Sequence, residues 1–497
     1  MKQFIFFCLA LFCAAALDAQ VQHRVNNTGV SAEYNDLEDA IEDNPAGHTY
    51  VVEGSDFDYG QVQVDKKATV YGPGYFLDEN LAYDTIQGDT RASELLDLKM
   101  QDDSDNSFIQ GLTIRDLKIQ SGANNITISR CRITGFIDVQ ENVTNLTIIQ
   151  CYIESEENQG VLVYLKQATN VVMSNNVIMA NNPDNGSHCV LMEEAGGSGV
   201  FRNNIFFGQP KNTFKNATVQ NNYFYESVID HNESSNLVVD HNISNDLFLN
   251  TYYGGTSNFN LADTDYLPDS IVDFMNAPSP DHMFELRDVP TNPAIGGGTG
   301  GDDMGPYDGD YPYEPSGLPS IPRVWFFNPT GVATPGGSFP AQVKAKAGDP
   351  LITPMPDVIS MEYFFGADPG YNNATQFVFP QSGPVFIGTS VFAVPGVIPN
   401  SFHRIYYRAK DENGDYGLTQ RAWVYVSNIS YLIADMNDDG VVNVTDMIIF
   451  FTEMGCVADP MEGEVCNSDF NGDNMVTTAD LLLFMSYFGL PGQSPPG

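Results

Sequence analysis

Seven nine-residue segments align without gaps between Gly111 and Ser244: GLTIRDLKI (111–119), NITISRCRI (125–133), NLTIIQCYI (145–153), NVVMSNNVI (170–178), SGVFRNNIF (198–206), NATVQNNYF (216–224) and NLVVDHNIS (236–244). Position one is Asn in five of the seven, positions two and four are mostly aliphatic, and position seven is Leu, Cys, or Asn. This period-two alternation predicts short strands that each bury one face. The segments start 14 to 28 residues apart, within or near the range of solenoid repeats.

The repeats predict a right-handed parallel β-helix, because no helical period separates the strands and identical positions recur once per coil. Stacked Asn side chains can hydrogen-bond to the coils above and below, and Asn tolerates the left-handed backbone of a sharp turn. We therefore expect the Asn columns to lie inside the solenoid, with Cys131 and Cys151 as buried stacking residues. These columns resemble those of the pectate-lyase-like superfamily.

The first 19 residues have the pattern of a secretory signal. Lys2 precedes an apolar run from Phe4 to Leu17, and a small-residue cleavage site ends at Ala19. No other apolar run is long enough to span a bilayer. We therefore expect the mature chain to be secreted or held at the cell surface, without a membrane span.

The charge balance limits the possible partners. The chain has 22 basic and 64 acidic residues, a formal net charge of −42. This excludes nucleic acid as a partner, because nucleic-acid binding relies on cationic contacts to phosphate. It also disfavours polyuronates and sulfated glycans unless calcium bridges the like charges.

Residues 20–303 are predicted to form the β-helix, beginning with a capping helix. Leu37, Ala40 and Ile41 share one face of a helical pattern, as expected for a helix that covers the open end of a solenoid. The stretch YGPGYFL (71–77) resembles a segment of exported β-helix proteins of Bacteroidetes-type bacteria. Residues 304–322 are rich in Pro, Gly and Tyr, which predicts a linker, and they resemble the closing segment of that family.

Residues 323–429 change character. Runs such as RVWFF, SMEYFFG, PVFIGTSVFAV and RAWVYV predict strands with turns about every ten residues, hence an antiparallel, immunoglobulin-like β-sandwich. Two segments, MEYFFGADPGYNNAT and FHRIYYRAKDENGDYGLTQRAWVYV, resemble a sandwich module common in Bacteroidetes surface proteins. A spacer is the favoured interpretation, and glycan binding through exposed Tyr and Phe is the alternative.

Residues 430–490, before a short tail at 491–497, contain two acidic loops of one pattern, 34 residues apart. Loop positions 1, 3, 5, 7, 9 and 12 supply oxygen ligands to calcium in motifs of this kind. The predicted ligands of two Ca²⁺ sites are Asp435, Asn437, Asp439, Val441, Asn443 and Asp446 in the first loop, and Asp469, Asn471, Asp473, Met475, Thr477 and Asp480 in the second. Each loop runs into an apolar helix, which predicts a small α-helical module.

The paired loop–helix units resemble the type I dockerin module more than a helix–loop–helix EF-hand. The resemblance implies a cohesin-like protein partner that contacts loop positions 10 and 11. These positions are Val444 with Thr445 in the first loop and Thr478 with Ala479 in the second. The alternative is a calcium-stiffened module used for stability or attachment. Between the loops, Cys456 and Cys466 flank an insert and could form a disulfide outside the cell.

The loops between coils are the predicted binding face, because insertions in a solenoid collect on one side. The candidate groups are Lys166, His188, Glu193, Glu194, Arg202 and Lys211, with a possible basic spot at Arg130, Arg132 and Lys166. No acid or base pattern of a polysaccharide lyase or glycosidase is evident. Two hypotheses follow: a non-catalytic exported protein whose β-helix binds polysaccharide or a surface, and a polysaccharide lyase or glycoside hydrolase that carries a dockerin.

Overall fold

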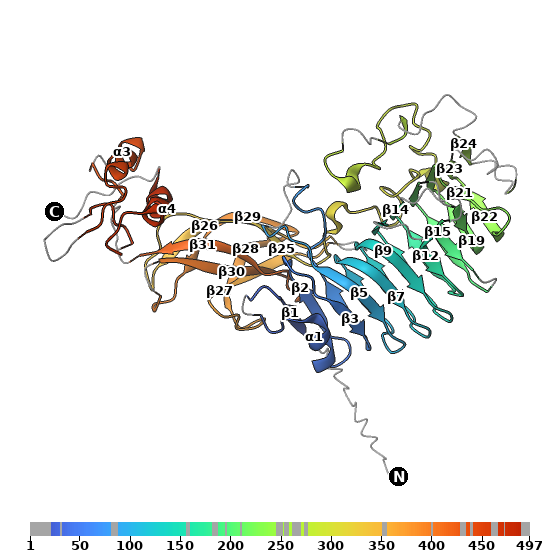
Figure 1. The fold of residues 1–497 in the computed structure, drawn as a ribbon, viewed down its shortest axis with the longest axis horizontal. Helices are drawn as coiled ribbons and strands as arrows, with labels where there is room; N and C mark the ends of the chain where they lie inside the picture. Colours follow the sequence, from blue (N-terminus) through green and yellow to red (C-terminus); the bar gives the residue numbers. More distant parts are fainter. Residues whose placement is uncertain are drawn as a thin grey trace, which may run out of the picture.

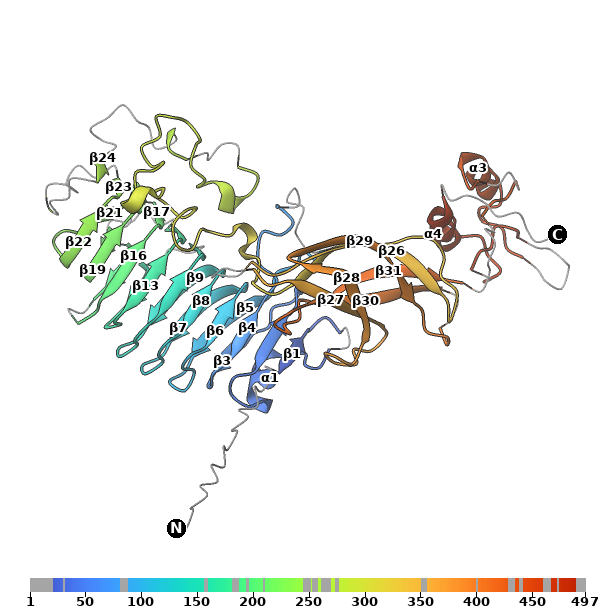
Figure 2. The ribbon, with the colours of Figure 1, turned by 180° about the vertical axis from the view of Figure 1, so that it is seen from behind.

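The computed structural model describes residues 21–29, 32–80, 88–155, 160–180, 187–193, 196–208, 211–244, 252, 258–260, 270–272, 277–349, 355–398, 401–427, 434–437, 441–458, 466–471 and 473–488. The predicted signal segment, 1–19, lies outside these residues. The chain is mostly β-structure and elongated, with parallel coils at one end, an antiparallel domain in the middle and two short helices at the other end (Figures 1 and 2).

Two long parallel sheets make up the N-terminal domain, which we call the coil domain. The ten-stranded sheet contains β1 (Gln22–Val25), β2 (Thr49–Val52), β4 (Thr69–Tyr71), β6 (Phe108–Gln110), β8 (Thr127–Ser129), β10 (Thr147–Ile149), β13 (Val171–Ser174), β16 (Gly199–Arg202), β19 (Lys215–Gln220) and β22 (Ser235–Asp240). The fourteen-stranded sheet contains β3 (Gln61–Val64), β5 (Glu94–Met100), β7 (Thr113–Ile119), β9 (Arg132–Val139), β11 (Tyr152–Glu154), β12 (Val161–Leu165), β14 (Val177–Met179), β15 (His188–Met192), β17 (Ile205–Phe207), β18 (Lys211–Thr213), β20 (Tyr223–Tyr225), β21 (Val228–Ile229), β23 (Ile243–Ser244) and β24 (Phe259–Asn260).

The strand pairing is compatible with the predicted parallel β-helix. Corresponding strands of successive coils pair in parallel, as in the run β8–β10–β13–β16. At β9 the larger sheet divides into two branches, because Arg132 and Ile133 pair with β11 whereas Ile137 to Val139 pair with β12. The coils that follow therefore have three parallel faces around one apolar core.

Position seven of the repeat forms the predicted internal column. Asn176, Asn204, Asn222, Asn242 and Asn258 are buried, and the amide of each of the first four donates to the carbonyl oxygen of the next at 2.9–3.0 Å. The earlier coils fill the column with Leu117, Cys131 and Cys151, all fully buried. Burial raises the pKa of the Cys131 thiol to about 12, so this cysteine packs as a neutral side chain.

Position one does not lie inside the solenoid, so that expectation is wrong. Its Asn residues have positive φ values of 45° to 56° and exposed side chains. They form an outer ladder in which Asn145 donates to Asn125 at 2.8 Å and Asn236 donates to Asn216 at 2.9 Å. Only an inward-facing strand residue is buried by coil stacking, and position one is instead the left-handed turn that precedes the strand.

The predicted capping helix is present as α1 (Leu37–Asp43). Asp36 caps its N-terminus by accepting hydrogen bonds from the backbone N–H groups of Glu38 and Asp39. Leu37, Ala40 and Ile41 are fully buried in the core of the coil domain, as the periodicity predicts.

Residues 299–320, which we call the strap, run back along the outside of the coils (Figure 1). The strap includes η4 (Thr299–Gly301) and η5 (Pro315–Gly317), and η3 (Pro280–His282) precedes it. Its partners are Asn221 Oδ1 with Thr299 N (2.8 Å), Asn203 Nδ2 with Asp303 O (3.1 Å), Asn175 Nδ2 with Pro306 O (2.8 Å), Gln150 Nε2 with Pro312 O, Arg130 with Leu318 O (2.8 Å) and Gln110 Oε1 with Ser320 N (2.7 Å). The composition of 304–322 predicts a linker, whereas the structure docks the strap on six consecutive coils.

Two antiparallel sheets form the middle domain. One contains β25 (Arg323–Pro329), β26 (Ser338–Lys346) and β29 (Val385–Ala393), and the other contains β27 (Val358–Phe365), β28 (Thr375–Gly383), β30 (Ser401–Asp411) and β31 (Gln420–Val426). Buried residues of both sheets share one hydrophobic cluster, so the sheets pack face to face as the predicted sandwich.

The terminal module contains α3 (Val444–Thr452) and α4 (Thr478–Tyr487), each preceded by one of the acidic loops. Its core includes Phe450, Phe470 and Phe484. Tyr425 of β31 belongs to the same cluster and lies 5.9 Å from the ring of Tyr487, so the module packs against the end of the sandwich.

Candidate metal centre of the terminal module

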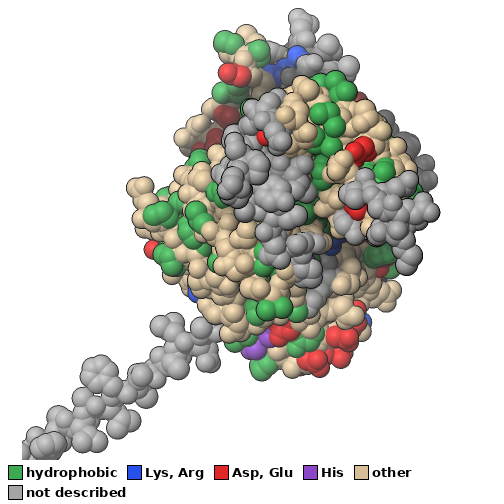
Figure 3. Space-filling model, turned by 90° about the vertical axis from the view of Figure 1, so that its left-hand side faces the viewer, with side chains coloured by type: hydrophobic (Ala, Val, Ile, Leu, Met, Phe, Trp, Pro, Cys, Tyr) green, Lys and Arg blue, Asp and Glu red, His purple; other side chains and the backbone are tan. Residues whose placement is uncertain are grey.

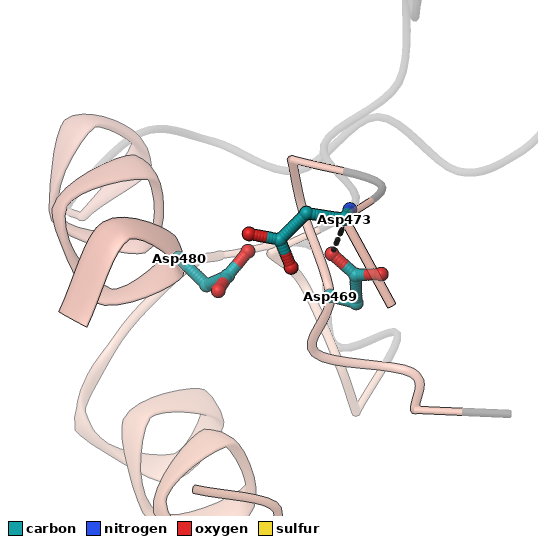
Figure 4. A group of neighbouring side chains, drawn as sticks. All are labelled: Asp469, Asp473 and Asp480. Carbon is teal, nitrogen blue, oxygen red and sulfur yellow. Dashed lines mark hydrogen bonds between the residues drawn. The ribbon is translucent and has the colours of Figure 1, made fainter. Parts of the chain in front are cut away.

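The second acidic loop brings three carboxylates together. Ligand oxygens of Asp469, Asp473 and Asp480 lie within 4.8 Å of one another (Figure 4). Asp480 projects from the first turn of α4, whereas Asp469 and Asp473 come from the loop that precedes the helix. Within the loop, the backbone N–H of Asp473 donates a hydrogen bond to Asp469 Oδ1 at 3.2 Å, which holds these two residues close together.

Asp480 is fixed before any ion binds. The side chain is fully buried, and its Oδ1 accepts hydrogen bonds from the backbone of Phe470 and Asn471 at 2.9 and 3.1 Å. Its Oδ2 accepts from Thr477 N at 2.8 Å, which completes a capping box at the start of α4. Thr477 Oγ1 also donates to Oδ2 at 3.3 Å, so one residue caps the helix and closes the loop.

The first loop repeats this geometry where the structure describes it. Asp446 is fully buried, and its Oδ1 accepts from Met436 N and Asn437 N at 2.8 and 3.1 Å. Its Oδ2 accepts from Asn443 N at 2.9 Å, again as a capping box. Asp439 and Gly440 lie outside the described residues, so the predicted site in this loop is only partly visible.

The other predicted ligands of the second loop surround the three carboxylates. Asn471 Nδ2 donates to Asp473 Oδ2 at 3.0 Å, and Met475 N donates to Asp473 Oδ1 at 2.9 Å. Thr477 is the N-cap of α4. Of the six predicted ligand positions in this loop, the structure brings the carboxylates of Asp469, Asp473 and Asp480 together.

The module contains no side chain that could neutralise these carboxylates. Residues 430–497 include eight Asp and three Glu but no Lys, Arg or His. Converging carboxylates repel one another, and a proton, a cationic side chain or a metal ion can neutralise this repulsion. The oxygen-only donor set fits a hard cation such as Ca²⁺, for which Asp469, Asp473 and Asp480 are the side-chain ligands that the geometry supports.

A disulfide and an acidic side chain connect the two loop–helix units. Cys456 and Cys466 are bonded, with their Cα atoms 6.0 Å apart. Glu453 at the end of α3 accepts hydrogen bonds from Ser468 N at 2.7 Å and from Asn467 Nδ2 at 3.1 Å. Although burial alone raises its pKa, these hydrogen bonds lower the pKa of Glu453 below its ordinary value. The two loops are thereby held in a fixed relation.

A second acidic cluster lies where the coil domain meets the sandwich, and we call it the junction cluster. Asp368 Oδ2 accepts hydrogen bonds from Arg24 of β1 and from Arg408 of β30, both at 3.0 Å. Arg24 also pairs with Glu53, and Arg408 also pairs with Glu362. Burial alone would lower the pKa of Arg24, and its two carboxylate partners raise it above the ordinary value. Each of the three carboxylates thus has at least one arginine partner, and the cluster keeps a formal net charge of −1.

The candidate groups on the coil domain form two neighbouring pairs. His188 and Lys211 begin paired strands, β15 and β18, and Lys166 and Glu193 follow the paired residues Leu165 and Met192. Each has a nearby partner: Lys211 with Asp230 at 2.9 Å, Lys166 with Gln140 at 2.7 Å, His188 with Glu233 at 3.9 Å and Glu193 with Tyr164. Arg202 lies apart on β16 and pairs with Asp310, and Glu194 lies outside the described residues.

The suggested basic spot does not form. Arg130 is buried and is occupied by the strap, with its guanidinium donating to the backbone of Leu318 and Asp349. Arg132, at the start of β9, pairs with Glu154 and lies 4.6 Å from the Phe76 ring centroid. Lys166 follows β12, which pairs with the opposite end of β9. The expectation that these residues line one groove is wrong, because the long strand β9 separates them.

Sequence reasoning missed the junction cluster and the strap. The junction joins residues more than 300 positions apart, such as Arg24 and Asp368, and no local pattern marks them. The strap had a signal in position six of the repeat, which is polar in the segments from 125 onward. Its residues have positive φ values of 48° to 57°, so their side chains point away from the core and toward the strap.

Comparison with known proteins identifies no relative, since no family model matches the chain and a search of curated proteins returns no match. No helix among the described residues combines the length and the apolar character needed to cross a bilayer.

Proposed function

We propose that the chain is an exported, calcium-binding scaffold protein that attaches through its terminal module. In this proposal the coil domain is a right-handed β-helix of the pectate-lyase-like kind, the sandwich is an immunoglobulin-like spacer, and the terminal module is dockerin-like. Calcium bound by the two loops would order the module. The protein would be secreted or held at the cell surface.

The observation that carries the proposal is the meeting of Asp469, Asp473 and Asp480 in a module without a single cationic side chain. A cluster of acidic residues at a surface is common, but here the third carboxylate is buried and fixed by three backbone donors. The same arrangement recurs around Asp446 in the first loop. A duplicated, pre-ordered carboxylate is what a pair of calcium loops requires.

The surface of the two helices supports attachment to a protein partner. Ile448 and Phe451 of α3 are 62 and 48% exposed, and Leu482 and Met485 of α4 are 66 and 49% exposed. The residues at loop positions 10 and 11 are also exposed, on the first turns of the same helices. Exposed apolar side chains at this density are typical of interaction surfaces. We propose a cohesin-like domain as the partner.

The coil domain would be the part that contacts polysaccharide or a surface, and a catalytic role has less support. In the described part of the coil domain, Lys118, Arg132 and Lys211 each form an ion pair with a carboxylate, at 2.8, 2.6 and 2.9 Å. A base for a lyase reaction must be free to abstract a proton. The alternative, a lyase or glycoside hydrolase, predicts product release from plant or algal polysaccharides, measurable as unsaturated or reducing ends.

Calcium titration of the full chain by calorimetry tests the proposal. We expect two sites with dissociation constants at or below about 10 μM, because sensor-type loops span about 0.1–10 μM. Asp473→Asn should weaken one site at least about tenfold. Glu141→Gln, an exposed charge change on the coil domain, is the matched control and should leave both sites unchanged. Binding no tighter than millimolar, or an equal effect of both variants, would contradict the proposal.

Attachment is tested separately by measuring the affinity of the full chain for type I cohesin domains, with calcium and with EDTA. We expect binding only with calcium, and a loss of at least about tenfold when Ile448 and Leu482 are both changed to Asp, because a buried charge replaces apolar contact. Calcium binding without cohesin binding would leave the module as a calcium-stiffened terminus and would remove the partner from the proposal.

A further inference from the structure

The sandwich differs in charge from the rest of the chain. Residues 323–427 contain seven Lys or Arg and seven Asp or Glu, so this domain is formally neutral in a protein of net charge −42. The terminal module beside it has eleven acidic residues and no basic ones. Basic residues are therefore enriched in the sandwich relative to the rest of the chain, and their positions indicate where an acidic ligand would bind.

Two of these cations lie on the outer face of the four-stranded sheet without a carboxylate partner. Arg404 of β30 and Arg421 of β31 are exposed, and neither forms an ion pair with any carboxylate in the described part of the chain. The nearby carboxylates already have other arginine partners: Glu362 and Asp368 pair with Arg408, while Glu53 and Asp89, which line a small pocket with Arg421, pair with Arg24 and Arg91. The two guanidinium groups are thus available to a ligand.

Aromatic side chains alternate with these arginines in the strand register. Phe402 pairs with Tyr425, Arg404 pairs with Trp423, and Tyr406 pairs with Arg421. Cross-strand neighbours on one face lie about 5 Å apart, and diagonal neighbours lie about 7–8 Å apart. Aromatic rings and guanidinium groups therefore lie side by side on what we call the β30–β31 face, with Tyr406 and Tyr425 largely buried between the exposed side chains.

Aromatic and guanidinium side chains of the β30–β31 face are exposed to solvent. Trp423 is 56% exposed, and the guanidinium of Arg404 lies 4.8 Å from its ring centroid. Phe402 is 37% exposed and, with Arg404 and Tyr406, lines a hollow of about 420 Å³ that reaches the end of β27. Stacking on Trp423 holds the guanidinium group of Arg404 in place and leaves the N–H donors at its edge free to bind a ligand.

We propose that the β30–β31 face binds an acidic polysaccharide whose repeating group is a carboxylate, that is, a polyuronate. The planar guanidinium groups of Arg404 and Arg421 match carboxylates in two-pronged hydrogen bonds. The Trp423 ring offers an apolar platform for the C–H face of a sugar. An open face with two separated cations suits a chain that repeats its charge along its length.

The acidity of the other domains does not prevent this contact. At physiological ionic strength, charges farther apart than about 8 Å are largely screened from one another. The local pairing of Arg404 and Arg421 therefore decides whether a polyanion can bind this face. Because no metal ion takes part, the inference is independent of the calcium sites, and binding in EDTA separates the two proposals.

Affinity electrophoresis of the full chain, through gels that contain soluble polymers, tests the inference. In EDTA, we expect polygalacturonate to retard the protein and neutral dextran to leave its mobility unchanged. Binding should weaken as sodium chloride is raised, because the contact is ionic. No retardation by polygalacturonate, or equal retardation by neutral dextran, would overturn the assignment.

Variants locate the site. The double variant Arg404→Gln/Arg421→Gln should weaken polygalacturonate binding at least about tenfold, and Trp423→Ala should weaken it about five- to tenfold. Arg115→Gln removes an exposed arginine of the coil domain, whose side chain is 53% exposed, and should change binding less than twofold. Equal losses in all variants, or none in the β30–β31 variants, would overturn the inference.

Three further measurements test whether a loss of binding comes from the site and whether the ligand group is a carboxylate. Each variant should melt at the wild-type temperature, and Arg404→Lys, which keeps the charge but not the fork, should bind with intermediate affinity even if the glutamine variants fold poorly. Dextran sulfate should bind more weakly than polygalacturonate. Equal or tighter binding of dextran sulfate would overturn the assignment to a carboxylate polymer.

Discussion

The junction cluster and the second acidic loop both gather three carboxylates, but they balance this charge in opposite ways. At the junction, Arg24 and Arg408 lie among Glu53, Glu362 and Asp368, and Asp368 accepts from both arginines at 3.0 Å. In the loop, Asp469, Asp473 and Asp480 converge with no basic residue anywhere in the module. At the junction every carboxylate has an arginine partner within the chain, whereas the three carboxylates of the loop have no basic partner within the module.

This difference separates architecture from function. A cluster whose carboxylates all have arginine partners fixes how the coil domain and the sandwich sit together, and further contacts such as Tyr416 N to Gln22 Oε1 at 2.8 Å support the same interface. A cluster that the chain leaves unbalanced makes local stability depend on the medium, since an ion that binds only the folded state stabilises it. The comparison therefore predicts that the two regions respond to different perturbations.

Calcium removal should have the largest effect and should be confined to the module. With dissociation constants near 1 μM and 1 mM calcium, each site would contribute about 4 kcal/mol to the stability of the module. EDTA should therefore abolish or shift a separate melting transition of the module and leave that of the coil domain and sandwich in place. Differential scanning calorimetry measures this, and a single transition unaffected by EDTA would contradict it.

Breaking the junction should have the next largest effect, and this effect should not depend on calcium. Arg408→Met leaves Glu362 buried without its arginine and Asp368 with Arg24 alone, which should cost about 3–5 kcal/mol. Chemical unfolding followed by intrinsic fluorescence should show this loss equally in calcium and in EDTA. The control is Arg115→Met, an exposed site where the change should stay within about 0.5 kcal/mol. A loss that appears only in EDTA would couple the two clusters and contradict their separation.

Sequence patterns predict a contact well when it repeats, and poorly when it does not. Position seven of the repeat is buried as predicted, because stacking identical coils places Asn204 directly beside Asn176 and Asn222. Position one has the same residue type but lies at the turn, and the residue type alone does not distinguish the buried column from the exposed turn. The spacing of the two acidic loops predicts calcium ligands, whereas the role of Asp446 and Asp480 as helix caps appears only with the backbone in place.

The junction and the β30–β31 face could not be predicted for a further reason. Arg24 meets Asp368 across 344 residues, and that contact depends on how two domains dock. Arg404 and Arg421 are ordinary strand residues until the register places Trp423 and Tyr406 opposite them. Alternation of aromatic and basic residues along β30 was visible, but the pairing partner in β31 was not.

The inner and outer Asn ladders should differ by a smaller but measurable amount. Asn204→Ala leaves the backbone N–H of Asn176 and the amide of Asn176 without their shared acceptor inside the core, and should cost about 2 kcal/mol. Asn145→Ala removes an exposed bond to Asn125 and should cost about 0.5–1 kcal/mol, mainly through the left-handed φ of 56°. Urea unfolding of the coil domain compares the two variants. Equal losses of unfolding free energy would mean that burial does not determine how much each Asn ladder stabilises the fold.

The smallest effect concerns the difference between the two acidic loops. Position six is Gly440 in the first loop and Asn474 in the second, where Asn474 has a φ of 67° and its N–H donates to Asp469 Oδ2 at 2.7 Å. Asn474→Gly keeps that donor and removes the left-handed penalty of about 0.5–1 kcal/mol, so it should tighten the second site about two- to fivefold. Asn474→Ala should weaken it, because Ala keeps the β-carbon and loses the local hydrogen bonding that lets Asn tolerate this conformation. Calorimetric titration resolves both changes, and a second site indifferent to them would show that backbone strain at position six does not limit how the loop closes around its ion.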